Sequence, residues 1–143
     1  MPHTTVEIRT LSGSSLAIGS AGPRTVTIDR SKEANGVGLG FNGGELLLLA
    51  IGGCYSNDIF REAEKRGLAV RNVEVTVEAD WGGDPVRAQN VLFSVKIHSD
   101  APERQILDLI HHTDRVAEIP NSLRFGTEVK LLEARAITGE KTG

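Results

Sequence analysis

The chain has 143 residues, a net charge of −3 and one cysteine. This length is typical of a single domain with one ordinary core, and one cysteine excludes an internal disulfide. The low charge, without any block of lysine or arginine, argues against nucleic acid as the main ligand. The first residues, MPHTTVEIRT, carry charges where a secretory signal would be apolar, and no apolar run reaches about 18 residues. We therefore expect a cytoplasmic protein without a membrane span.

Apolar and polar residues alternate in three short stretches of the first thirty residues, and turn-forming residues at 12–13 and 21–23 separate them. A period of two residues is typical of strands that bury one face. The pattern predicts a three-stranded antiparallel meander. Its expected apolar positions are Val6, Ile8, Leu16, Ile18, Val26 and Ile28.

A glycine-rich stretch, NGVGLGFNGG, leads into a long apolar helix that we expect over residues 42–66. Asn42 is the expected N-cap, with Glu45 placed as in a capping box, and Gly67 is the expected stop. The stretch has G-x-G-x-x-G spacing, but the nearest predicted strand ends near residue 29 and the following strands read as antiparallel. A flexible loop is therefore expected there in place of a dinucleotide site.

Residues 73–79 and 91–97 alternate again and predict a β-hairpin with its bend at residues 81–85. A second helix is expected to begin with Asp100 as its N-cap and to be broken by Pro120. Pro102 lies in its expected first turn, and its inner stripe is Ile106, Leu109, Ile110 and Ala117.

The chain is expected to end in one more strand over residues 127–137. The apolar phase of this strand shifts between Leu131 and Leu132, which indicates a bulge. The tail after Thr138 is expected to be frayed.

The predicted order is βββ-α-ββ-α-β, an α+β fold in one domain over residues 1–143. The central helix is apolar on every side from Leu46 to Ile51, and a single sheet covers only one face of a helix. We therefore expect a homodimer in which two such helices lie between sheets.

Cys54 is the main candidate for chemistry. A free cysteine usually behaves as a small buried hydrophobe. However, Gly52 and Gly53 precede it, and each glycine within a helix costs about 1 kcal/mol relative to alanine, which indicates that something packs closely there. Polar residues follow at Ser56 and Asp58, so Cys54 lies at the border between an apolar and a polar half of the helix.

A reactive Cys54 would need a group that favours its thiolate, and Asp58 on the same helix would oppose one. Activation is therefore expected from an arginine outside the helix, and Arg9, Arg24 and Arg30 are the candidates from the meander and the loop that follows it. The four histidines do not have the spacing of a metal site, and we expect neither a metal nor a cofactor.

The stretch NGGELLLLAIGGCYSNDI, together with the order of elements, resembles the OsmC/Ohr family, the osmotically inducible protein C-like and organic-hydroperoxide-resistance proteins. The resemblance implies an OsmC-like fold, an intertwined homodimer and thiol-dependent reduction of organic hydroperoxides. In the family, a glutamate and an arginine assist the reactive cysteine, and a second cysteine captures its sulfenic acid.

The chain departs from that family pattern in three places. Ile119 or Asn121 stands where the second cysteine is expected, and Gly44 stands where the peroxidases carry their glutamate. The arginine has no firm counterpart. The family resemblance therefore implies a one-cysteine reaction that depends on an external thiol, with Cys54, Glu45 and Arg30 as the candidate catalytic residues.

Two functions are compatible with these residues. One is a thiol redox protein, a possible one-cysteine peroxidase, that reduces organic hydroperoxides through Cys54. The other is a protein without catalysis that binds an apolar small molecule in a pocket at the dimer interface, lined by Cys54, Ile51 and Phe41.

Overall fold

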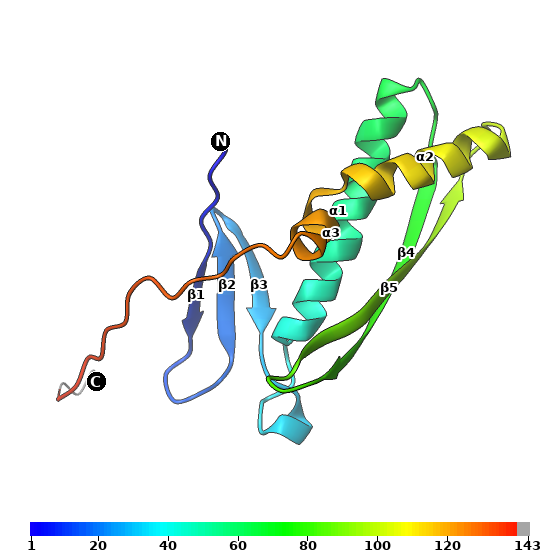
Figure 1. Cartoon of the computed structure of the whole chain (residues 1–143). Coiled ribbons are helices and arrows are strands. Elements are labelled where there is room, and N and C mark those ends of the chain that lie inside the picture. The colour runs from blue at the N-terminus through cyan, green and yellow to red at the C-terminus, as the bar shows by residue number, and fades with distance from the viewer. Residues whose placement is uncertain (140–143) are drawn as a thin grey trace.

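The computed structural model describes residues 1–139 and contains an N-terminal sheet, a long helix with a hairpin against it, and two shorter helices (Figure 1). The N-terminal strands are β1 (Glu7–Thr10), β2 (Ala17–Ala21) and β3 (Arg24–Ile28), followed by the short 3-10 turn η1 (Lys32–Ala34). The remaining elements are α1 (Gly43–Lys65), β4 (Asn72–Gly82), β5 (Arg87–His98), α2 (Glu103–Val116) and α3 (Glu118–Arg124).

The three-stranded meander is confirmed, with antiparallel pairing in the order β1-β2-β3. One of its expected apolar positions is wrong. The register places Gly19 of β2 between Ile8 and Val26, whereas Ile18 lies in the neighbouring row, on the other face of the sheet. A Cβ atom on Gly19 would lie 2.9 Å from the Cδ1 atom of Ile28, so the glycine makes room for this side chain.

The glycine-rich loop after β3 is held by the buried carboxylate of Asp29. One carboxylate oxygen accepts hydrogen bonds from the Ser15 hydroxyl and the Arg30 backbone, and the other accepts from the backbone N–H groups of Val37 and Gly38. These bonds, led by that of Ser15, lower the pKa of Asp29. The glycines of this loop therefore serve a tight turn against the chain itself.

The central helix begins as predicted. Asn42 accepts a hydrogen bond from the Glu45 backbone, and the Glu45 carboxylate accepts one from the Asn42 backbone, which completes a capping box. The helix ends before Gly67, whose φ of +66° suits a residue without a side chain.

The β4–β5 hairpin is confirmed, but β4 continues through Trp81 and Gly82, which pair with Ala88 and Arg87. An irregularity between Glu78 and Asp80 shifts the register of the two strands. The strands therefore stay paired beyond the point where the alternation of apolar and polar residues stops. The bend therefore lies later than predicted, between the paired ends of β4 and β5.

The core lies where α1 packs against the hairpin and α2. It is formed by Tyr55, Ile59, Ala63, Ile106, Leu109 and Ala117. The Tyr55 hydroxyl donates to the Ile110 carbonyl at 2.8 Å, and its ring lies 5.0 Å from that of Phe93. Burial of this side chain raises the pKa of Tyr55.

Two predictions for the second helix are wrong. Its N-cap residue is Pro102, and Asp100 instead forms an ion pair with Arg71 at 3.2 Å. Pro120 does not break this helix, because Ala117 has already left the helical conformation and Pro120 lies in the first turn of a new helix, α3. Proline is tolerated there since the first N–H groups of a helix have no partner within it.

The predicted last strand is not formed within one chain. Residues 127–139 run as an extended segment without strand pairing, and their apolar side chains Val129, Leu131, Leu132 and Ile137 are each more than four-fifths exposed. In Figure 1 this segment leads away from α3 toward the N-terminal sheet. The predicted frayed tail lies mostly outside the described residues.

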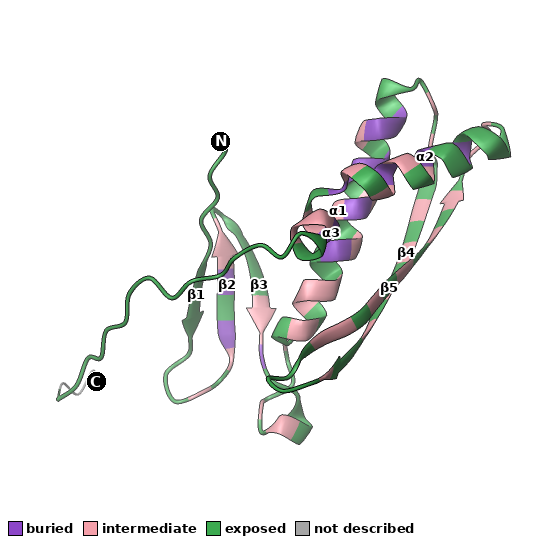
Figure 2. Ribbon diagram, in the orientation of Figure 1, coloured by how far each residue is buried: buried purple, intermediate pink, exposed green. Residues whose placement is uncertain are grey.

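Exposed residues are not confined to this segment, since parts of α1 are exposed as well (Figure 2). On α1, Leu49 and Phe60 are about half exposed, and Ala50 and Gly53 are exposed between them. These four residues repeat at helical spacing, so one face of α1 has no cover within the chain. Among residues 1–139, none of the helices is both long and apolar enough to cross a membrane.

Candidate functional site

Cys54 lies in the middle of α1 and is half-buried. Its sulfur lies 3.7 Å from Oδ2 of Asp58, one helical turn further along, and the thiol donates a hydrogen bond to this carboxylate. Asp58 is 7% exposed. The thiol is therefore neither enclosed in hydrocarbon nor free in solvent, and its polar neighbour is a buried carboxylate.

Asp58 belongs to a cluster of charged side chains that joins three helices. Its other oxygen lies 3.2 Å from Nη1 of Arg61, and the same guanidinium contacts Glu62 of α1 and Glu118 of α3. His112 of α2 reaches Glu62, with 2.7 Å between Nε2 and Oε1. The carboxylate next to Cys54 is thus held by groups from the same helix and, through Arg61 and Glu62, by α2 and α3.

Glu62 is the most strongly stabilised anion of the cluster. Its carboxylate is 5% exposed and is paired with Arg61, with Lys65 and with His112. The hydrogen bond from His112, followed by those from Lys65 and Arg61, lowers the pKa of Glu62 from 4.5 to about 2.

Glu62→Gln is expected to remove a pH-dependent part of the stability. Because the folded state lowers the pKa of Glu62, its ion pairs stabilise the fold above the unfolded value and are lost as the pH falls toward about 2. The free energy of unfolding of the variant should therefore be lower than wild type near neutral pH, and the difference should shrink between about pH 4.5 and 2. Denaturant unfolding at several pH values measures this. Glu64→Gln, at an exposed position of α1, is the control, and a difference that does not change with pH contradicts the prediction.

The other two predicted site residues lie apart from the thiol. Glu45 is exposed at the start of α1, where it completes the capping box, and Arg30 is exposed in the loop after β3. Within residues 1–139 of one chain, neither side chain forms a hydrogen bond with Cys54. Arg9 on β1 and Arg24 on β3 are both exposed.

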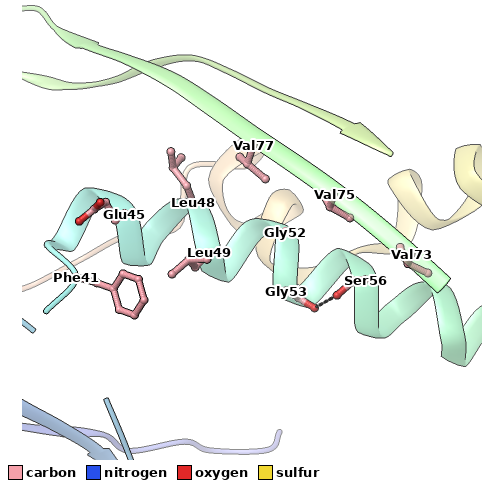
Figure 3. Close-up of a pocket in the computed structure, with 10 residues that line it drawn as sticks. All are labelled: Phe41, Glu45, Leu48, Leu49, Gly52, Gly53, Ser56, Val73, Val75 and Val77. Carbon is pink, nitrogen blue, oxygen red and sulfur yellow. Dashed lines mark hydrogen bonds between the residues drawn. The ribbon is translucent and has the colours of Figure 1, made fainter. Parts of the chain in front are cut away.

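A groove of about 480 Å³ runs between α1 and β4 (Figure 3). Phe41, Leu48 and Leu49 line it from α1 and the residue before its cap, and three valines line it from β4: Val73, Val75 and Val77. Its polar groups are Glu45 and the Ser56 hydroxyl, which donates to the Gly53 carbonyl at 3.0 Å.

Of the pocket residues predicted from the sequence, Phe41 lines this groove, whereas Cys54 and Ile51 do not. Ile51 faces a separate small cavity beside Pro120.

The two glycines before Cys54 have different surroundings. A Cβ atom on Gly52 would lie 3.0 Å from Cγ2 of Val77, so this glycine allows β4 to approach α1. A Cβ atom on Gly53 would have no neighbour within 4 Å in the described chain. Packing within the chain therefore explains why Gly52 is present despite its cost to helix stability. It does not explain Gly53.

A family model described as OsmC-like protein matches residues 36–132, which include the helix with Cys54 and the charged cluster. The chain belongs to the OsmC-like protein family. Solved structures show that other proteins share this fold. An OsmC-like protein from Mycoplasma pneumoniae has a TM-score of 0.73 at 17% identity, with 88% of this chain and 89% of that one covered.

Two further solved structures are named as organic hydroperoxide resistance proteins. That from Legionella pneumophila has a TM-score of 0.63 at 16% identity and covers 87% of this OsmC-like chain and 90% of its own. That from Vibrio cholerae, with captopril in one of its active sites, has a TM-score of 0.58 at 21% identity. The match covers 89% of this chain and 86% of the Vibrio chain. At these identities the similarity shows a common fold. No curated protein sequence matches the chain.

Sequence reasoning missed the arginine of this OsmC-like protein that contacts the carboxylate beside Cys54. Arg61 follows Cys54 by seven residues and Asp58 by three, so all three lie on one face of α1. The sequence alone contains this spacing, but it shows Asp58 only as a charge that opposes a thiolate and therefore favours an arginine from another element.

Proposed function

We propose that this OsmC-like protein is a thiol redox protein that reduces organic hydroperoxides through Cys54. The observation that carries the proposal is the half-buried thiol with a buried carboxylate as its hydrogen-bond partner, in the centre of the segment that matches the family. The family-level association with hydroperoxide resistance supports the same chemistry.

The proposed reaction has two stages. The sulfur of Cys54 attacks the terminal oxygen of the hydroperoxide, the O–O bond breaks, and the products are a sulfenic acid on Cys54 and an alcohol. Because the chain has one cysteine, an external thiol then forms a mixed disulfide with Cys54 and releases water. A second external thiol restores Cys54 and leaves as a disulfide. The cytoplasm is the proposed location, since thiols are kept reduced there.

Glu45 and Arg30 remain candidate supports of Cys54 in this proposal. Glu45 precedes Cys54 by nine residues on α1, a distance of about 13 Å along the helix axis. Glu45 would therefore have to reach the sulfur from a second chain, and Arg30 from a second chain or after a movement of its loop.

We also propose that the protein acts as a homodimer in which a second copy covers the exposed face of α1. Gly53 has open space around it in one chain although a glycine within a helix is costly, and Leu49 and Phe60 are exposed beside it. The extended segment over residues 127–137 has the alternation of a strand but no strand partner of its own. Both features are explained if two copies exchange these surfaces around a twofold axis.

The function is tested by treating the purified protein with cumene hydroperoxide and measuring intact mass and thiol titre. The expected result is a rapid gain of one oxygen atom together with loss of the free thiol. Addition of a dithiol should restore the original mass and the full thiol titre. A thiol that stays reduced contradicts the proposal and favours the second candidate below.

The second candidate is binding of an apolar small molecule without catalysis. The observation that favours it is the groove between α1 and β4, which is lined mainly by aliphatic side chains and does not include Cys54. A ligand in this groove would not need the thiol.

Gly52→Leu is expected to weaken the binding of an apolar fluorescent dye by about tenfold or more, a loss of about 1.4 kcal/mol. The reason is that the new side chain must either fill the groove or push Val77, and β4 with it, away from α1. Fluorescence titration measures the affinity, and thermal unfolding shows whether the variant is folded. Cys54→Ser is the control and should retain binding. Equal affinity in wild type and a folded Gly52→Leu variant would exclude the groove as the site.

A further inference from the structure

The hydrogen bond between Cys54 and Asp58 has a consequence for the proposed reaction. The thiol donates to Oδ2 of Asp58 at 3.7 Å, and this carboxylate is buried and therefore shielded from bulk water. In this hydrogen bond the sulfur is the donor and the carboxylate is the acceptor. The same contact places a proton acceptor beside the sulfur at the moment when it attacks.

Asp58 is held in place by its surroundings. Arg61 contacts its second oxygen, so that Oδ2 is the oxygen left to face the sulfur. Arg61 is itself held by Glu62 from α1 and by Glu118 from α3.

The charged groups around this pair come from all three helices. Arg61, Glu62 and Lys65 belong to α1, His112 of α2 faces Glu62, and Glu118 of α3 faces Arg61. The Arg61 guanidinium is the cation in direct contact with Asp58, and it offsets the negative charge next to the sulfur.

Attack of a thiol on a hydroperoxide requires two proton movements. The sulfur loses its proton, and the departing alkoxide, a stronger base than a thiolate, gains one. A group that touches the sulfur and has a free oxygen can do both.

We propose that Asp58 is a catalytic residue of this OsmC-like protein. Asp58 takes the Cys54 proton as the S–O bond forms and returns it to the alkoxide as the O–O bond breaks. This assignment rests on the proposed function. The net reaction converts one thiol and one hydroperoxide to one sulfenic acid and one alcohol.

The test compares the rate of Cys54 oxidation by cumene hydroperoxide in wild type, Asp58→Asn and Asp58→Glu between about pH 6 and 9.5, a range that brackets the ordinary thiol value of about 8.5. Wild type should react at a rate that changes little with pH. Asp58→Asn should be slower by about 100-fold near pH 6, since its thiol must first lose a proton to solvent, and should approach wild type at the alkaline end. Asp58→Glu should recover part of the rate. Glu64→Gln, which removes an exposed carboxylate of the same helix, should match wild type.

A second measurement reports on the contact itself. The chain has one cysteine, so its infrared spectrum contains one S–H stretching band. In Asp58→Asn this band should move to higher frequency, because a neutral amide is a weaker acceptor than a carboxylate. An unchanged thermal unfolding curve with a shifted band shows that the variant is folded and that the contact has changed.

The outcomes separate the two proposals. If wild type is not oxidised, the proposed function fails and the assignment of Asp58 fails with it. If wild type is oxidised and Asp58→Asn has the same pH profile or reacts faster, only the role of Asp58 is overturned. If Asp58→Glu is as slow as Asp58→Asn although its band matches wild type, the carboxylate is not the proton acceptor.

Discussion

Cys54→Ser is expected to abolish the proposed consumption of organic hydroperoxides by the protein in the presence of a dithiol. A hydroxyl differs from a thiol by one atom and still donates to Asp58, but its oxygen does not become a sulfenic acid. The rate should fall by about 1,000-fold or more, to the level of the dithiol alone, because the loss of a nucleophile removes the reaction path itself. A peroxide assay with time points measures this, and the thermal unfolding midpoint should remain close to wild type.

A control variant moves the thiol within the same helix. Cys54→Ser combined with Ser56→Cys turns the thiol by about 200° around the helix axis, toward the groove between α1 and β4. The thiol then has no contact with Asp58, and hydroperoxide consumption should stay at background. If this variant is as active as wild type, the surroundings of position 54 do not matter, and the reaction reflects an ordinary exposed thiol.

Phe60→Asp is expected to convert the proposed homodimer into a monomer. In one chain this side chain is 48% exposed, so a charge there costs the isolated fold little. At an interface between two copies, the same charge would be buried twice without a partner, at a cost of several kcal/mol. Light scattering after gel filtration should give twice the chain mass for wild type and the chain mass for the variant.

Leu107→Asp is the matched control for this experiment. Leu107 lies on α2, outside the uncovered face of α1, and is 47% exposed. Its exposure therefore matches that of Phe60, and in both variants an apolar side chain is replaced by aspartate. This variant should remain a dimer. A wild-type protein that is monomeric at micromolar concentration, or a dimeric Phe60→Asp variant, contradicts the proposed interface.

Local patterns in the sequence were sufficient for much of the fold. The capping box of Asn42 and Glu45 involves residues three apart, and the hairpin follows from an alternation that repeats every second residue. The meander was predicted for the same reason, although Ile18 was assigned to the wrong face. A shift of one residue in register reverses the face of every side chain, and the register depends on the neighbouring strand.

Other features depend on contacts between distant parts of the chain. The sequence by itself determined that α1 would be long, apolar and interrupted by glycines before a lone cysteine. Only the tertiary structure decided that Gly52 meets Val77, that the groove and the thiol lie on different faces of α1, and that α2 and α3 supply His112 and Glu118 to the cluster beside Asp58. The physical reason is that helical periodicity places residues on a face of their own helix but does not say which element packs against that face.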